Sequence, residues 1–184
     1  MNMKKITILA MLVLCTSVIA LAQPEQGKFR FSVGPEVGYV AGTYAQTWNL
    51  GAGASAQAEY FFTDHTSLTV LGGFIGYLGG TVPGSPGYKY HSMNIIPVEA
   101  GIRFYVGECF HIGGQLGAGF IDNGAGHTTA FAYSPIIGYN FKTGNDKGID
   151  FSIKYDGYSF SQKDIPNGYG GTFGAVGLRL AYIF

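Results

Sequence analysis

The chain has 184 residues, which is enough for one domain, and it is rich in glycine (30), phenylalanine (14) and tyrosine (13), with only 12% charged residues. Eleven basic residues balance eleven acidic ones, so no electrostatic argument supports nucleic-acid binding. We predict a signal peptide over residues 1–22 and a single domain over residues 23–184.

The N-terminus has the three parts of a secretory signal peptide. Lys4 and Lys5 precede the apolar stretch Ile6–Ala20, and Ala20-Leu21-Ala22 forms a small-x-small cleavage site. A membrane anchor is the first alternative, but the stretch is short for a bilayer span. A lipoprotein signal ending at Cys15 is the second, although a bulky leucine stands before that cysteine.

After cleavage, nine basic residues face eleven acidic ones, and the net charge is near −2. Cys109 is then the one cysteine left, so an intrachain disulfide is not possible. No later apolar run approaches the length of a transmembrane helix, yet the chain is hydrophobic overall. This combination favours a membrane barrel, in which only every second residue meets lipid.

Alternation of apolar and polar residues predicts eight strands, each long enough to cross a bilayer when tilted. In the sixth, Phe131, Ile137 and Tyr139 share one face, while Ser134 and Asn140 share the other. A soluble lipocalin-like or streptavidin-like barrel would place its apolar face inward, whereas here the charged residues share the glycine-rich face. The predicted strands are Lys28–Val40, Gly51–Phe62, Thr66–Leu78, Ser92–Val106, Cys109–Ile121, Thr129–Lys142, Gly148–Phe160 and Gly171–Phe184.

The connections between these strands alternate in length. Short turns fall at 63–65, 107–108 and 143–147, and longer loops rich in Gly, Pro, Asn and Tyr fall at 41–50, 79–91, 122–128 and 161–170. Outer-membrane barrels have short periplasmic turns and long extracellular loops. We therefore expect both termini in the periplasm. Gly72-Gly73 and Gly113-Gly114 are interpreted as bends or bulges.

The last strand places Leu178, Leu180, Tyr182 and Phe184 on one face. With the strand count and the loop asymmetry, the terminal Tyr182-x-Phe184 makes the chain resemble the OmpA/OmpX-type eight-stranded barrels. That resemblance implies an all-β, eight-stranded antiparallel up-and-down transmembrane barrel in the outer membrane of a Gram-negative bacterium. It also implies outer-membrane lipids and the barrel assembly machinery as partners, a monomer, and an assembly signal at Tyr182 and Phe184. Arg179 departs from the family pattern, which has glycine five residues before the final aromatic.

Charged residues are predicted to fill the lumen, because an eight-stranded barrel is only wide enough for side chains. Buried charges must pair or be hydrated. We predict a structural ion-pair network; the alternative is a narrow conducting path or proton relay. The residues of the predicted network are Glu36, Glu59, Glu99, Arg103, Lys154 and Arg179, and the other polar residues predicted to point inward are Arg30, Gln57, His111, Gln115, Asp150 and Asp156.

No motif in the sequence indicates catalysis. A lipid A deacylase of this barrel class would show a His-x-Ser pair near the outer leaflet, but His65-Thr66-Ser67 falls in a short turn. The four histidines have no metal-ligand spacing. We predict a non-enzyme without catalytic, cofactor-binding or metal-binding residues, acting structurally or by surface contact through its long loops. The alternatives are a small channel or carrier, a lipid A-modifying enzyme, and a PorT-type secretion or assembly accessory.

Overall fold

The computed structural model describes residues 26–82, 84–85, 87–107, 109–124, 126–143, 147–160 and 171–184; the predicted signal peptide lies outside them. Among these residues, no helix is long and apolar enough to cross a membrane. The elements in chain order are β1 (Phe29–Ala41), the 3-10 helix η1 (Gly42–Gln46), β2 (Trp48–Thr63), β3 (Thr66–Gly79), β4 (Met93–Val106), β5 (Phe110–Asp122), β6 (His127–Lys142), β7 (Gly148–Ser159) and β8 (Thr172–Ile183).

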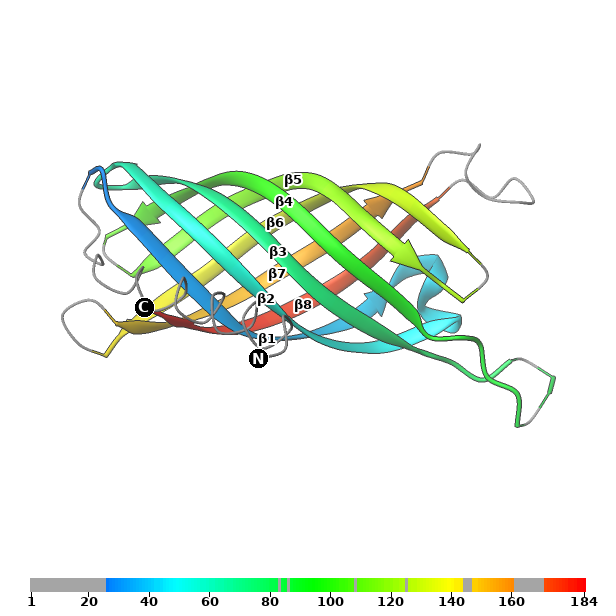
Figure 1. Cartoon of the computed structure of the whole chain (residues 1–184). Coiled ribbons are helices and arrows are strands. Elements are labelled where there is room, and N and C mark those ends of the chain that lie inside the picture. The colour runs from blue at the N-terminus through cyan, green and yellow to red at the C-terminus, as the bar shows by residue number, and fades with distance from the viewer. Residues whose placement is uncertain are drawn as a thin grey trace, which may run out of the picture.

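The eight strands form one closed barrel (Figure 1). Each strand pairs antiparallel with its neighbours in the sequence, and β8 closes on β1. Closure leaves no strand edge unpaired, as a structure immersed in lipid requires. The predicted fold class is confirmed. The largest difference in strand bounds is in β2, which begins at Trp48 rather than Gly51, because η1 occupies only the first half of the predicted loop.

The predicted alternation of loop lengths holds only in part: the β5–β6 connection, predicted to be long, covers only 123–126, whereas the β6–β7 turn, predicted to be short, covers 143–147, and the predicted loop 161–170 lies outside the described residues. The start of β1, the end of β8 and the short connections lie at one end (Figure 1). At the other end, the connection between β3 and β4 extends beyond the barrel as a narrow ribbon, in which Thr81 bridges Lys89. The Val82 N–H donates to the Tyr88 carbonyl at 2.9 Å. This ribbon carries Tyr88, whose side chain is 73% exposed.

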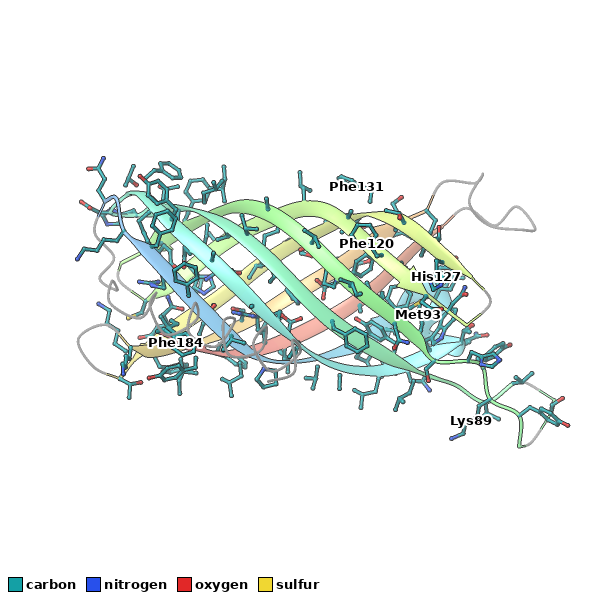
Figure 2. The ribbon with its side chains drawn as sticks, viewed as in Figure 1. Lys89, Met93, Phe120, His127, Phe131 and Phe184 are labelled. Carbon is teal, nitrogen blue, oxygen red and sulfur yellow. The ribbon has the colours of Figure 1, made fainter. Side chains whose placement is uncertain are left out.

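The outer wall is apolar, as predicted for a barrel surrounded by lipid. Its exposed side chains are large hydrophobic residues on all eight strands. Aromatic residues mark both ends of the wall: Figure 2 places Phe120 and Phe131 toward the long connections and Phe184 toward the opposite end. A soluble barrel would have the reverse polarity, with a polar exterior and an apolar interior.

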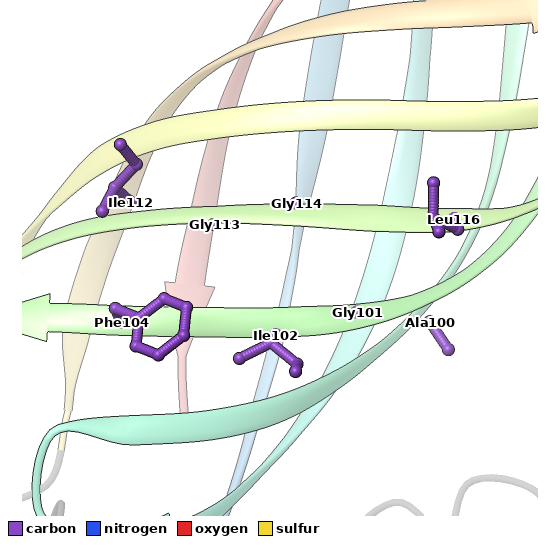
Figure 3. Close-up of a pocket in the computed structure, with 8 residues that line it drawn as sticks. All are labelled: Ala100, Gly101, Ile102, Phe104, Ile112, Gly113, Gly114 and Leu116. Atoms are coloured by element: carbon purple, nitrogen blue, oxygen red, sulfur yellow. The ribbon is translucent and has the colours of Figure 1, made fainter.

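One hollow in this wall lies between β4 and β5 (Figure 3). It has a volume of about 530 Å³ and is lined in part by Gly114. A Cβ atom added to this glycine would meet nothing within 4 Å. Ile102, Phe104, Ile112 and Leu116 surround it. The side chains that line it are all apolar. They can contact hydrocarbon tails, but they include no polar group that would favour one lipid over another.

The glycine pairs do not form bulges, so that part of the interpretation was wrong. Pairing of β3 and β5 with β4 keeps one register past Gly72-Gly73 and Gly113-Gly114. Register shifts occur instead between β2 and β3, near Trp48 and Phe61. Other glycines make room inside the barrel: a Cβ on Gly119 would lie 2.5 Å from the Tyr158 ring.

Candidate functional site

Glu36 is the centre of one group of charges inside the barrel. Lys154 Nζ lies 2.7 Å from Glu36 Oε2, and Arg179 Nε lies 3.4 Å from Glu36 Oε1. The Ser55 hydroxyl donates to Glu36 and accepts from Arg179 Nε at 2.8 Å. These side chains come from β1, β2, β7 and β8 and are almost completely buried. Three residues of the predicted network therefore meet here.

A second group of charges surrounds Glu59 and lies nearer the short turns. Arg30 Nη1 is 3.7 Å and Arg103 Nη1 is 3.9 Å from Glu59 Oε2, and the Tyr105 hydroxyl donates to Glu59 Oε1 at 2.7 Å. The Arg30 guanidinium also lies 4.7 Å from the centre of the Phe61 ring. The structure thus places Glu59 beside Arg103 and adds Arg30, which the sequence placed inside but not in the network.

Asp150 joins these two groups. Its Oδ2 lies 3.1 Å from Arg103 Nη1 and 3.4 Å from Arg179 Nη1, and its Oδ1 lies 3.2 Å from His111 Nε2. His111 is completely buried. The sequence predicted that Asp150 faces inward but did not give it this connecting role. The role depends on which strands lie opposite each other across the lumen.

Glu99 differs from the other predicted members. Among the described residues, no ion pair reaches it; its Oε1 lies 3.1 Å from the Ser134 hydroxyl. The same hydroxyl lies 2.9 Å from Asp156 Oδ1, and Asp156 pairs with Lys154 at 3.3 Å. Because a hydroxyl carries one hydrogen, Ser134 can donate to only one of these carboxylates at a time. Among the described residues, the hydrogen-bonded link from Glu99 to the charges therefore runs through Ser134.

The charges in the described lumen nearly balance. Five acids (Glu36, Glu59, Glu99, Asp150 and Asp156) share the interior with four permanent cations (Arg30, Arg103, Lys154 and Arg179). The Ser55, Ser67 and Tyr105 hydroxyls donate to the glutamates, and Gln57 Oε1 accepts from Arg103 Nη2 at 3.3 Å. Such an arrangement compensates buried charges and fills the cross-section with side chains.

An apolar plug, for which the sequence showed no distinct motif, fills the lumen toward the long connections. Its rings meet at Phe173: the Tyr77 ring centre is 5.1 Å away, and those of Tyr44 and Tyr158 are both 6.1 Å away. Trp48 covers it and donates from Nε1 to the His91 carbonyl at 3.0 Å. The other buried members are Val40, Ile75, Met93, Ile95, Ile121, Ala130, Ala132 and Ala175.

The C-terminal residues lie at the short-turn end of the outer wall. Tyr182 pairs with Val33 of β1, and its ring lies 5.1 Å from the ring of Phe184. The Phe184 N–H donates to the Phe31 carbonyl at 3.0 Å. Both predicted assembly residues therefore lie at the seam where β8 closes on β1.

The histidines are dispersed through the fold. His65 is exposed in the turn between β2 and β3, while the Ser67 hydroxyl points into the lumen and donates to Glu59. His127 is exposed near Asp122, at the opposite end of the barrel from His65. No group of three or more potential metal ligands is found among the described residues.

Solved structures of other proteins share this architecture. No curated protein matches the chain. OprG from Pseudomonas aeruginosa has a TM-score of 0.55 at 12% identity, covering 87% of this chain and 97% of its own. Ail from Yersinia pestis has a TM-score of 0.51 at 18% identity, covering 86% and 99%. Neisserial surface protein A has a TM-score of 0.55 at 12% identity, covering 84% and 94%.

These identities support a likeness of fold alone. The family assignment comes from the sequence: a family model described as an outer membrane protein beta-barrel domain matches residues 7–184. The match covers all eight strands and both predicted assembly residues. This chain belongs to the outer membrane β-barrel domain family.

Proposed function

We propose that this protein is a closed, non-catalytic barrel that anchors a contact surface at the exterior of the cell. The observation that carries the proposal is the double filling of its lumen. An ion-pair network occupies the half near the short turns, and an apolar plug occupies the half near the long connections. A barrel filled in this way offers a solute no evident path, so its exposed ends become the surfaces available for function.

The proposed orientation places the short turns and both termini in the periplasm. The chain then arrives from the periplasm, and the barrel assembly machinery recognises Tyr182 and Phe184 on the closing strand. The apolar wall contacts lipid around its whole circumference, which suits a monomer. The ribbon between β3 and β4 would project from the cell, carrying Tyr88 and Tyr90. Tyrosine side chains provide large contact areas with few rotatable bonds.

A structural neighbour supports a role at the exterior. Ail, whose name is attachment invasion locus protein, has been solved in complex with sucrose octasulfate, a heparin analogue. That structure has a TM-score of 0.52 and 19% identity to this chain. A barrel of this fold can therefore hold a ligand. The present chain carries a net charge near −2 after cleavage, so a polyanion is not the ligand that we expect here.

The test uses cells that produce the wild-type protein or a variant in which a two-residue turn replaces residues 80–90. An epitope inserted after Gly84 should be reached by antibody on intact cells. Wild-type cells should adhere to wells coated with a matrix protein or a neutral polysaccharide, and the shortened variant should lose that adherence while still assembling. Buried epitopes or equal adherence would contradict the proposal, and altered lipid A in the mass spectrum would contradict its non-catalytic part.

A further inference from the structure

A second groove on the outer wall differs from the apolar hollow of Figure 3. It has a volume of about 610 Å³ and lies at the long-connection end of β3, β4, β5 and β6. Asn94, Asp122 and His127 pair across neighbouring strands and form one polar row. Ile96 and Phe120 pair in the next row toward the middle of the barrel, and Phe74 completes an apolar floor.

A polar row directly beyond an apolar floor is what a barrel surrounded by lipid is expected to place at the boundary between hydrocarbon and headgroups. Side chains of the floor are about half exposed, as expected where strands face lipid tails. His127 lies beyond Phe120 toward the end of the barrel (Figure 2). A lipid molecule could therefore place its tails on the floor and its headgroup against the polar row. A water-soluble ligand without tails would leave the apolar floor of the groove uncovered.

The chemistry of the row favours a neutral headgroup that both donates and accepts hydrogen bonds. Among the residues that the structure describes, Asp122 is the one acid lining the groove, and no Lys or Arg lines it. The Gly124 N–H donates to Asp122 Oδ1 at 2.9 Å, which fixes the carboxylate, and His127 Nδ1 lies 3.8 Å from Asp122 Oδ2. A phosphate would be repelled by this carboxylate, whereas a sugar hydroxyl can donate to it.

We propose that this groove binds the saccharide headgroup of a glycolipid from the surrounding leaflet. Asp122 accepts hydrogen bonds from sugar hydroxyls, Asn94 and His127 supply further donors and acceptors, and Phe120 packs against the carbon face of the sugar or the first atoms of the tails. This proposal rests on the proposed function in one respect: the proposed orientation makes the outer leaflet the source of the lipid. The chemistry of recognition is independent of orientation.

The test measures lipid binding to the full-length mature barrel in detergent by native mass spectrometry. The probes are galactosyl diacylglycerol, phosphatidylglycerol with the same acyl chains, diacylglycerol, and free methyl galactoside. We expect galactosyl diacylglycerol to bind about tenfold more tightly than the other two lipids, because its several uncharged hydroxyls can donate to the Asp122 carboxylate. Methyl galactoside should bind far more weakly, because it lacks tails.

Asp122→Ala should remove the preference for the galactosyl lipid, and Thr172→Ala, at the same end of the barrel on β8, should retain it. Unchanged gel mobility before heating would show that both variants fold. In the wild type, backbone NMR signals of Asn94, Asp122 and His127 should shift on titration with the galactosyl lipid. Equal binding of phosphatidylglycerol, equal binding of the free sugar, or absent shifts in this row would overturn the proposal. Failure of the epitope test alone would overturn only the assigned leaflet.

Discussion

Replacing Glu36 with glutamine removes one charge from the lumen while nearly preserving the volume of the side chain. Lys154 and Arg179 lose their shared partner at 2.7 and 3.4 Å, although Lys154 keeps Asp156 at 3.3 Å and Arg179 keeps Asp150 at 3.4 Å. Removing one member of a buried ion pair costs about 3–5 kcal/mol. Because both cations retain one partner, we expect a loss near the lower limit, about 3 kcal/mol in the free energy of unfolding.

Glu99→Gln is the matched control, because it makes the same chemical change in the same lumen. No ion pair among the described residues involves Glu99, so the direct contact that the substitution weakens is the one with the Ser134 hydroxyl. A hydrogen bond to a charged group contributes about 1.5–3 kcal/mol, and the amide oxygen of glutamine can still accept from Ser134, so the net loss should be about 1 kcal/mol. The loss in the free energy of unfolding should therefore be about one third of that in Glu36→Gln.

The assay is urea unfolding of the barrel in lipid vesicles. It can be followed by the fluorescence of Trp48, the one tryptophan of the chain, and by gel mobility without heating. The dependence of the free energy on urea concentration should stay unchanged, because each variant exposes the same surface on unfolding. Equal losses for Glu36→Gln and Glu99→Gln, or a Glu36→Gln variant as stable as the wild type, would refute the reasoning that ion pairs stabilise the lumen.

Three further predictions concern the closing strand, the wall and the plug. Deleting Phe184 should lower the folded fraction in outer membranes more than shortening any long loop, because the Phe184 N–H pairs with β1 at the seam; equal fractions would contradict the assembly role. Ile153→Arg, midway along the wall, should cost about 2–4 kcal/mol in urea unfolding and Leu78→Arg, at its rim, about 0–1 kcal/mol; reversed values would mean that the assumed membrane position is wrong. Gly119→Ala should lower the free energy of unfolding by about 1–3 kcal/mol, because the added methyl group overpacks the plug. Gly72→Ala should be nearly neutral, because a Cβ atom at Gly72 meets open space. Equal melting temperatures of the two variants would contradict the packing described for the plug.

The sequence was sufficient to predict the wall and the faces of the strands. Alternation specifies which side of each strand meets lipid, and a slip of one residue would have reversed every face. Ile137 pairs with Ile153 on the outside, while Gly138 pairs with Ser152 on the inside, in agreement with the predicted faces. The alternation is this clear because the lipid and the lumen demand opposite polarities.

The partners inside the lumen could not be predicted in the same way. Glu36 lies opposite Arg179 because β1 and β8 close with a particular stagger, and alternation along one strand contains no information about that stagger. Asp150 reaches both Arg103 and Arg179 for the same reason. Glu99 has the correct face but lies at a level where Ser134 and Asp156 are its neighbours.

The plug was missed for a different reason. Tyr77 and Phe173 occupy inward positions, and the ring of Tyr44, which packs against Phe173, comes from η1. A short 3-10 helix within a glycine-containing loop has no periodic signal. The inward parity of Tyr77, Ile95 and Phe173 was the one sign in the sequence that apolar residues gather at this end.

The central claim is that side chains close the lumen at both levels, and planar-bilayer conductance of the purified wild-type protein tests it most directly. We predict negligible conductance for the wild type. A variant with Phe173→Ala, Tyr77→Ala and Arg179→Ala opens both the plug and the network, and should conduct measurably if it remains folded on unheated gels. A steady, ion-selective conductance in the wild type would contradict the account and favour a channel.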